Sequence, residues 1–586
     1  MLAADDNSDT SSYGGWEEDD EEFYGENDED DEDDEEDEED EGGKGNDLEK
    51  LKRLREKVNW EIETDRHKFF CKFLRLIVKW EGQLPDLKEF FRVKEMDWLI
   101  DYSSKVHVRF CDEPDEFIDF VIKTGYKDEP EIDKDGNPIL RRTTPLHHAD
   151  YDAIRIHEVV CKLFQIYDRF DVNYSDESGL THFHVACMSG CNEVVNKFLE
   201  LGINPNFNVQ ESDTNTIDPP LHLALKYERG KVVQLLLQSG GNPNLANMEG
   251  LTPLHLICKK PLIEFFRLHE NISLAELFFK INDDMQQTLE IDVQDNLGNT
   301  PLHLALVGIR WKLVEFLLKK GVNPNLANKD GETPLHIICK GYSNDDWVKI
   351  LFENTDDKHR PLQIDALNNL GGTPLQCAVA NFQPKIVDVL LDHGADLSSF
   401  VFPPESYIKN MIHEYTIQIR TFEFVFSALS VIESLETKGY KLKHSDVLTI
   451  IKLFAAHGWY EKLPDCEKYW HDDEEFARIA KEQMVTPSQS LYDFIKLPSY
   501  KAQKLFAIKD YAKFSSGFHL FSADLRQACT MHLCNILMGK FFRRWALEFF
   551  LTMTRYRLPI LCCEIIIEHL KYVDLIRICV AANDPS

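Results

Sequence analysis

The stretch Gly298-Asn299-Thr300-Pro301-Leu302-His303-Leu304-Ala305 decides the fold, because close copies of it recur along the chain. Thr-Pro-Leu-His stands again at 252–255 and 333–336, and Pro-Pro-Leu-His-Leu-Ala stands at 219–224. Weaker copies begin at Thr144, Thr181 and Thr373. The steps from 219 to 252 and from 300 to 333 are both 33 residues. A period of this length predicts a stack of short modules rather than one globular core.

Each copy of this phrase predicts the start of a helix. The Thr hydroxyl can accept a hydrogen bond from an unpaired backbone N–H, and Pro fits the first helical position, where no N–H is needed. Just upstream, an Asn or Asp stands three residues before a Gly, which suits a tight turn with positive φ. These turns are 247–250, 295–298, 328–331 and 368–371. Downstream, apolar runs such as 232–237 and 313–318 predict a second helix that ends at a C-cap glycine, Gly241 or Gly321.

In these motifs, residues 105–400 resemble ankyrin repeats. The resemblance implies an all-α solenoid that binds another protein through its hairpin tips and inner helices. A His recurs in the phrase, at His147, His184, His222, His255, His303 and His336. A metal site needs several ligands that converge on one point, whereas these side chains stand one to a module. The resemblance implies instead that each His hydrogen-bonds the backbone of a neighbouring hairpin, so no metal and no cofactor is expected.

Residues at the tips of the predicted hairpins are the candidate target-binding residues. Side chains there point away from the stack, so they are expected to contribute little to the fold and to be available to a protein target. They are Met248, Glu249, Asn296, Leu297, Lys329, Asp330, Asn369 and Leu370. The chain is expected to bind this target as a monomer.

Acidic charge is concentrated at the amino-terminal end. Residues 1–47 contain 25 Asp or Glu and one Lys, so they carry −24 of the formal charge of −37. Such a segment cannot bury enough apolar surface to fold against its own repulsion, which predicts a disordered acidic tail. The alternative is a lure for a basic partner or a mimic of nucleic acid, because four aromatic residues stand among the acids. The remaining residues show no clustered basic charge, which disfavours nucleic-acid binding.

Targeting signals and disulfide motifs are not evident in the sequence. The 14 Cys form no CxxC pair, and the first residues lack the apolar core of a signal peptide, so the thiols are expected to be reduced. A membrane-spanning helix needs about 18 consecutive apolar residues. The best candidate, 545–570, is interrupted by charged residues and Pro559. A soluble protein of the cytoplasm is expected, with the nucleus as the alternative and no membrane partner.

Three further segments are predicted to be helical. Residues 48–104 carry apolar residues at helical spacing and are expected to cap the first repeat, which otherwise exposes its core. The run 117–125 resembles a second helix with its closing glycine, so a degenerate repeat is expected before Thr144. After Asp396 the phrase stops, and 401–489 is predicted to be a helical continuation, either degenerate repeats or a separate bundle.

A second motif lies near the carboxy-terminal end. Leu558-Pro559 predicts the start of a helix with Ile566, Ile567 and Leu570 on one apolar face, and Asp574 is predicted to be the N-cap of a second helix. This spacing resembles the F-box-like PRANC domain that closes ankyrin proteins of poxviruses and parasitoid wasps, and the resemblance covers 490–586. It implies a docking site for the Skp-type adaptor of a cullin–RING ubiquitin ligase. The site residues would be Leu558, Pro559, Ile566, Ile567, Leu570, Asp574, Leu575 and Ile578.

Two functions follow from these motifs. In the first, the repeats bind a target protein and the F-box-like hairpin binds the adaptor and cullin complex, so the chain is the substrate-recognition subunit of an SCF-type ligase. In the second, the C-terminal hairpin only completes the fold, and the chain is a scaffold or inhibitor that sequesters a partner such as a transcription factor. The motifs GxGxxG, GxxxxGK, HExxH and GxSxG are absent. No catalytic residue is therefore predicted, and the chain is expected not to be an enzyme.

Overall fold

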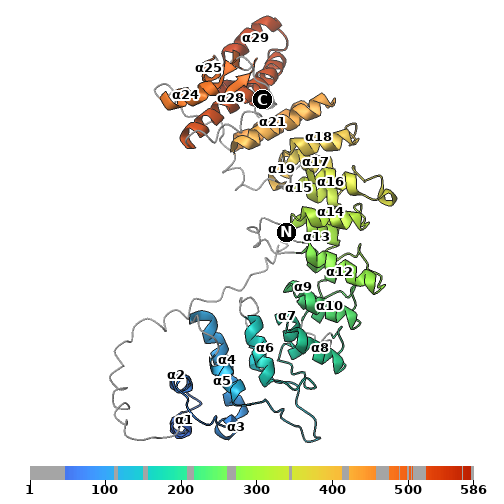
Figure 1. The fold of residues 1–586 in the computed structure, drawn as a ribbon. Helices are drawn as coiled ribbons and strands as arrows, with labels where there is room; N and C mark the ends of the chain where they lie inside the picture. Colours follow the sequence, from blue (N-terminus) through green and yellow to red (C-terminus); the bar gives the residue numbers. More distant parts are fainter. Residues whose placement is uncertain are drawn as a thin grey trace, which may run out of the picture. The chain divides into compact units, whose positions relative to one another are not determined.

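The computed structural model describes residues 47–110, 116–148, 156–207, 217–259, 272–341, 346–411, 421–456, 474–486, 489–497, 501–502, 505, 523–570 and 572–581. The chain divides into two compact units, residues 1–172 and 173–586, and each is described by itself. Helices dominate the described parts of both units (Figure 1). The expectation of a disordered tail falls outside the described residues, apart from Asp47, which opens the first helix.

The first unit is helical around an aromatic core. Its elements are α1 (Asp47–Glu56), α2 (Glu63–Val78), α3 (Leu87–Phe90), α4 (Val93–Phe110), α5 (Glu116–Lys123), the 3-10 turn η4 (Pro145–His148) and α6 (Ile156–Ile166). Helix α2 buries Phe69, Phe73 and Ile77 at helical spacing. The Phe73 ring lies 5.8 Å from the ring of Phe91 and 5.7 Å from that of Phe117, which joins α2 to α5.

The predicted degenerate repeat before Thr144 has several features of a repeat. Ile132 and Pro138 form a β-bridge at a hairpin, and the Thr144 N–H donates to His147 Nδ1 at 3.0 Å. The described part of the helix predicted at Thr144 is, however, the 3-10 turn η4. Arg142, next to this hairpin, donates to Asp97 on α4 at 2.7 Å and to Asp128 at 2.9 Å. This ion-pair network ties the hairpin to α4.

The second unit begins with pairs of short helices. They are α7 (His182–Ser189), α8 (Asn192–Glu200), α9 (Pro220–Lys226), α10 (Gly230–Gln238), α11 (Pro253–Cys258), α12 (Ser273–Asp284), α13 (Pro301–Val307), α14 (Trp311–Lys319), α15 (Pro334–Lys340), α16 (Asp346–Asn354), the 3-10 turn η6 (Asp357–His359), α17 (Pro374–Ala380) and α18 (Pro384–Asp392). First helices contact first helices, as in α11, α13 and α15, and second helices contact second helices, as in α14 and α16. The predicted helix starts are confirmed, because Pro is the first residue of α11, α13, α15 and α17.

Glycines shape the turns between these helices. The four tip glycines, Gly250, Gly298, Gly331 and Gly371, have φ between +75° and +79°, as predicted. Gly321, with φ of +86°, follows the end of α14 as predicted, but the prediction for Gly241 is wrong. After α10 the positive φ of +92° belongs to Gly240. Gly241 is needed for another reason, because a Cβ there would stand 2.7 Å from the Leu236 carbonyl oxygen.

Beyond the short pairs the unit continues in helices of more varied length and one small sheet. The elements are α19 (Glu405–Met411), α21 (Thr421–Thr437), α22 (His444–Ala456), α24 (Glu474–Glu482), β1 (Met484–Thr486), β2 (Gln489–Ser490), α25 (Leu491–Ile495), α28 (Ala523–Met553), α29 (Ile560–His569) and α30 (Tyr572–Ala581). Strands β1 and β2 pair antiparallel with an irregular register. Ser490 caps α25 by accepting from the Asp493 N–H at 3.2 Å. Among the described residues, no helix combines the length and apolar character that crossing a bilayer requires.

Helix α28 is the centre of this C-terminal region (Figure 1, orange to red). It contacts α21, α29 and α30, and it buries Leu533, Phe542 and Phe549. The predicted N-cap role of Asp574 is wrong, because α30 begins two residues earlier, at Tyr572. Asp574 therefore lies in the first turn, where its carboxylate stands 3.5 Å from Arg577 and near the positive end of the helix dipole.

Candidate protein-binding surface

In α7, α11, α13 and α15, the recurrent Thr and His hydrogen-bond each other across the first helical turn. At α13 the Thr300 N–H donates to His303 Nδ1 at 3.2 Å, and the Thr300 hydroxyl lies 2.8 Å from the same nitrogen. The Thr side chain in turn accepts from the His303 N–H, which completes a capping box. The same box forms at Thr181, Thr252 and Thr333, and Gln376 takes the place of the His after Thr373.

The other ring nitrogen of these His residues reaches the next hairpin. At His255, His303 and His336, Nδ1 accepts a backbone N–H, so the ring proton is assigned to Nε2, which donates to a carbonyl of the following module. His222 stands three residues after Pro219, which has no N–H to donate, and its Nδ1 has no partner among the described residues, but its Nε2 makes the same bond to the next module. The Nε2 to oxygen distances are 2.8 Å for His222 and Leu251, 3.0 Å for His255 and Asn299, 2.9 Å for His303 and Glu332, and 3.1 Å for His336 and Gly372. The predicted bonding to the neighbouring hairpin is confirmed for these four His residues, and it ties each of their modules to the next.

Burial keeps these imidazoles neutral. Desolvation lowers the pKa of His184 to about 4, because the charged ring would have to leave water. Desolvation also lowers the pKa values of His222, His255, His303 and His336, although the carbonyl that each ring donates to opposes the shift. A neutral ring suits the box, since a protonated Nδ1 could no longer accept the backbone N–H.

The hairpin tips form a continuous row held by main-chain hydrogen bonds. The Asn296 N–H donates to the Glu249 carbonyl at 2.9 Å, the Lys329 N–H to the Leu297 carbonyl at 3.0 Å, and the Asn369 N–H to the Asp330 carbonyl at 2.9 Å. Each bond joins one tip to the next along the stack. The four tips are therefore one surface, which we call the tip row, with residues 248–249, 296–297, 329–330 and 369–370.

All eight predicted target-binding residues lie exposed on the tip row. Met248, Leu297 and Leu370 are 73%, 68% and 73% exposed, which is high for apolar side chains. The expectation that tip side chains contribute little to the fold is wrong for two of them. Asn296 Nδ2 donates to the Met248 carbonyl at 2.8 Å, and Asn369 Nδ2 donates to the Lys329 carbonyl at 2.7 Å. These two amides strengthen the row itself, because a side chain that bonds a neighbouring main chain limits how the tips can separate.

Sequence reasoning missed a second row, on the first helices. The residue that follows the box His is half-buried and apolar in three successive modules, at Leu256, Leu304 and Ile337, whereas the residues beside it are buried. These positions are equivalent on α11, α13 and α15, which contact one another. The signal was present in the phrase, since an apolar residue recurs there. Val307 and Ile309, at the end of α13, add exposed apolar area at 61% and 50% exposure.

The predicted adaptor-binding residues do not share one surface. Ile567 and Leu575 are buried, Leu570, Asp574 and Ile578 are half-buried, and Leu558, Pro559 and Ile566 are exposed. The predicted common face of Ile566 and Ile567 is wrong, because neighbouring residues on a helix point about 100° apart, and Ile567 is buried whereas Ile566 is exposed. On α29 the exposed apolar residues Leu561 and Ile565 stand one turn apart and so share one face, which we call the exposed apolar face of α29.

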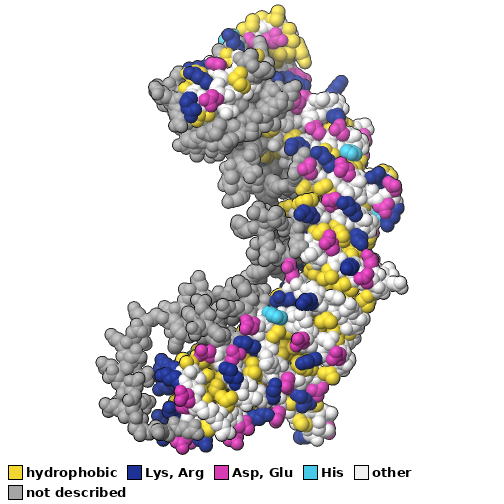
Figure 2. All heavy atoms as spheres, viewed as in Figure 1, with side chains coloured by type: hydrophobic (Ala, Val, Ile, Leu, Met, Phe, Trp, Pro, Cys, Tyr) yellow, Lys and Arg dark blue, Asp and Glu magenta, His cyan; other side chains and the backbone are white. Residues whose placement is uncertain are grey.

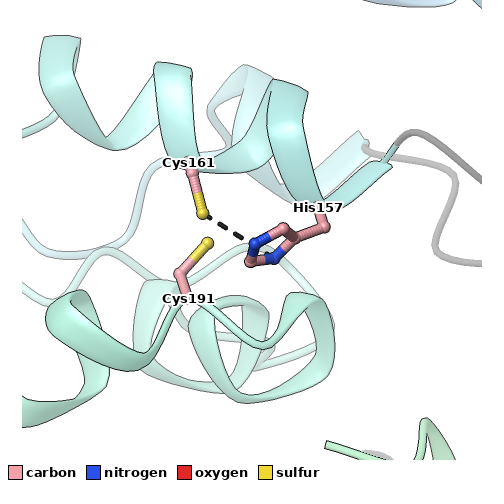
Figure 3. Close-up of side chains that lie close together, drawn as sticks. All are labelled: His157, Cys161 and Cys191. Carbon is pink, nitrogen blue, oxygen red and sulfur yellow. Dashed lines mark hydrogen bonds between the residues drawn. The ribbon is translucent and has the colours of Figure 1, made fainter.

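Ligand-type side chains also gather at α6 (Figure 3). His157 and Cys161 stand one turn apart there, with Cys161 Sγ 3.8 Å from His157 Nδ1. Cys191 belongs to the second unit, where it is the buried N-cap residue of α8 with Ser189 Oγ 3.3 Å from its sulfur. A structural zinc ion takes four ligands. The described residues of the first unit bring together two here, which does not define a metal site.

Hairpin tips, capping boxes and paired helices together define a stack of ankyrin repeats. The family described as "Ankyrin repeats (3 copies)" matches residues 221–327 and 308–400. The chain therefore carries ankyrin repeats, as the sequence motifs indicate.

Curated relatives match over the same kind of segment. The chain is 30% identical over 179 residues to "Transient receptor potential cation channel subfamily A member 1" of Homo sapiens, covering 30% of this chain and 15% of that protein. It is 33% identical over 170 residues to a "Putative ankyrin repeat protein" of Rickettsia bellii (strain RML369-C), which covers 28% of this chain and 45% of that protein. It is 32% identical over 133 residues to "NF-kappa-B inhibitor alpha" of Rattus norvegicus, which covers 22% of this chain and 41% of that protein. The chain thus spans less than half the length of these relatives.

Proposed function

We propose that the chain is a non-catalytic scaffold or inhibitor that holds one protein partner against the tip row and the adjoining first helices. The observation that carries the proposal is the exposure of Met248, Leu297 and Leu370 on tips whose backbones are fixed to one another. Apolar side chains held rigidly at a surface are typical of protein interfaces. A fixed backbone also lowers the ordering cost of binding, because the tips do not have to be immobilised.

Polar groups on the same row give the surface a charge pattern. Lys329 and Asp330 stand exposed on the third tip, and Glu249 on the first tip pairs with Lys259 at 2.9 Å. Charges at the rim of an interface select partners and steer encounter more than they add affinity. The proposed partner is therefore a protein with an apolar strip flanked by charges of both signs.

Sequestration is the proposed mode of action. The relative named NF-kappa-B inhibitor alpha is, by its name, an inhibitor of NF-kappa-B. By analogy we propose that this chain masks its partner, with a transcription factor as the example class, and that it acts as a monomer in the cytoplasm or nucleus. The tip row carries the proposal for binding, and the analogy carries the proposal for masking.

A triple variant tests the binding surface. Met248→Ser, Leu297→Ser and Leu370→Ser together should abolish capture of partners by the purified full chain, as measured by affinity purification and mass spectrometry. The melting temperature should change little, because all three side chains are exposed. The matched control changes Leu201, Val401 and Met553 to Ser, which are 58%, 58% and 48% exposed and lie outside the tip row. Equal loss of partners in both variants would contradict the proposal.

A second candidate function is target recruitment to a cullin–RING ubiquitin ligase. The observation in its favour is the exposed apolar face of α29, where Leu561 and Ile565 are 68% and 58% exposed. Such a face fits a groove on a helical adaptor of the Skp type. The chain would then act by proximity, because holding a target near a ubiquitin-conjugating enzyme raises the effective concentration of its lysines.

Binding of the adaptor separates the two candidates. Full chain carrying Leu561→Arg and Ile565→Arg should lose a purified Skp-type adaptor in a pull-down if the second candidate holds, whereas Met553→Arg should keep it. Absence of adaptor binding by the unaltered chain would leave sequestration as the proposed function. Target capture through the tip row should be the same in all three proteins.

A further inference from the structure

Helix α2 presents a line of four basic residues. Lys68, Lys72 and Arg75 on the helix and Lys79 at its C-cap follow one another at steps of 4, 3 and 4 residues, so they lie along one side, and all four are exposed. The opposite side buries Phe69, Phe73 and Ile77. We call the four residues the basic stripe. Figure 2 shows Lys and Arg side chains gathered over α1 and α2. The expectation that the chain has no clustered basic charge is therefore wrong for α2.

Nearby carboxylates do not balance the charge. Residues 47–81, from the start of α1 to just past the end of α2, contain ten Lys or Arg and seven Asp or Glu, which gives a net charge of +3. Lys50 pairs with Asp47 at 3.3 Å and Arg55 with Glu95 at 2.7 Å. Among the described residues, Lys68, Arg75 and Lys79 have no carboxylate oxygen within the 4.0 Å limit of an ion pair. The acidic side chains on α2 itself, Glu63 and Asp65, stand at its first turn, and the Glu63 carboxylate lies 3.8 Å from His67.

The acidic run of the chain joins the structure beside the stripe. Asp47, the first residue of α1, accepts the Glu81 N–H through Oδ2 at 3.0 Å, so the chain enters α1 next to the end of α2, where Lys79 stands. Residues 28–41 are all Asp or Glu, and the link 42–46 that follows is Gly42-Gly43-Lys44-Gly45-Asn46. Fully extended, that link spans roughly 17 Å. The stripe from Lys68 to Lys79 is roughly 16 Å long at the helical rise.

We propose that the acidic run 28–41 binds the basic stripe of the same chain. Charge complementarity and the short glycine-rich link carry the inference. Each exposed ion pair is weak, but a link of this length holds the run at a high effective concentration beside α2, which favours it over a separate acidic ligand. The stripe is then a binding site for an acidic polypeptide, and any other acidic protein or nucleic acid has to displace the run to reach it.

Zero-length cross-linking of the full chain locates the contact. A carbodiimide joins carboxylates to lysine amines, so at about 20 mM salt it should link residues 28–41 to Lys68, Lys72 or Lys79, and at about 500 mM salt the yield should fall because the charges are screened. An equal mixture of light and nitrogen-15 chains should give links within light or within heavy chains. Links between a light and a heavy chain would show that the run of a second copy binds the stripe. Absence of links to α2 would show that no acidic run of this protein binds it. Either outcome overturns the proposal.

Charge reversal tests whether the stripe holds the run. A glutamate-specific protease should cleave within 1–46 about tenfold faster when Lys68, Lys72, Arg75 and Lys79 are all changed to Glu, since the run loses its binding site. The matched control changes four exposed lysines of the second unit, Lys231, Lys280, Lys441 and Lys452, to Glu, which alters the net charge equally. Cleavage at the rate of the unaltered chain is expected for the control. Equal acceleration in both variants, or none in the stripe variant, would show that the run does not bind the stripe and would overturn the proposal.

Discussion

The ankyrin repeats and the C-terminal helices of the same unit are both all-helical, yet they are held together in different ways. In the repeats, the Thr–His box at Thr300 and His303 recurs, and each ring bonds the next hairpin. In the C-terminal region, α28 packs Phe542 and Phe549 against neighbouring helices without a recurring polar bond among the described residues. The comparison shows that a fold can be predicted from sequence where particular side chains repeat the same hydrogen bonds in every module, whereas side-chain packing alone leaves no such pattern.

The largest effect is expected when the packing of the C-terminal helices is disrupted. Phe542→Ala should lower the free energy of unfolding of this region by about 3–5 kcal/mol, because the ring is fully buried and its removal leaves a cavity. Hydrogen exchange should speed up in α28 and α21, while α13 and α14 stay protected, since repeats depend on their nearest neighbours. Met553→Ala, at a 48% exposed site on the same helix, is the control and should change stability by less than about 0.5 kcal/mol.

Lowering the pH should destabilise the repeats more than the C-terminal helices. The pKa of His184 falls from 6.5 to about 4 on folding, so between these values the unfolded chain binds more protons and stability decreases as the pH falls. For His184 alone this is about 3 kcal/mol between pH 7 and pH 4, at about 1.4 kcal/mol for each pH unit. Three more box histidines, and His222, have lowered pKa values, whereas among the described C-terminal residues only His532 does. Hydrogen exchange at several pH values should show the repeats opening first, and simultaneous opening of both regions would contradict the comparison.

A single box histidine should matter more than an exposed histidine of the C-terminal region. His303→Ala removes the bonds to Thr300 and to the Glu332 carbonyl, and we expect a loss of about 2 kcal/mol in the stability of the repeats. His569→Ala removes an exposed bond of 2.8 Å to the Ile565 carbonyl of its own helix, for which less than about 0.5 kcal/mol is expected. Denaturant unfolding followed by hydrogen exchange measures both. Similar losses would mean that the box adds nothing beyond ordinary helix packing.

The smallest expected effect is the difference in stability between losing a tip residue that bonds the adjacent tip and losing one that is only exposed. Asn296→Ala should lower the stability of the repeats by about 1 kcal/mol, because its amide bonds the Met248 carbonyl of the adjacent tip. Leu297→Ala, one residue away and 68% exposed, should lower it by less than about 0.5 kcal/mol. Thermal melting of the two variants checks the difference. A larger loss for Leu297 would make that side chain structural rather than available for binding.

The repeats and their tips could be predicted from sequence because each cue is local. Thr300 with Pro301 marks a helix start, Gly298 marks a positive φ, and the tip residues between them must point outward. The bond from Asn296 to the neighbouring tip could not be predicted in the same way, because the insertion between the two tips leaves the spacing of their side chains open. The missed row at Leu256 and Leu304 was visible as a recurring apolar position but lacked a cue for its exposure.

The C-terminal region could be predicted only as helix. Ile566 and Ile567 both fit an apolar face, and the choice between exposure and burial depends on α28, whose position no local pattern indicates. The strands Met484–Thr486 and Gln489–Ser490 are too short to show an alternation of apolar and polar residues. The basic stripe was visible as a spacing, but its significance required the burial of the opposite side of α2 and the proximity of Asp47 to Glu81.

The main-chain bonds between tips have a consequence for evolution. Since atoms common to every amino acid maintain the separation of neighbouring loops, mutation can exchange Met248, Leu297 or Leu370 while the scaffold keeps its dimensions. A lineage can therefore change the protein it captures through a few substitutions, without passing through an unfolded ancestor.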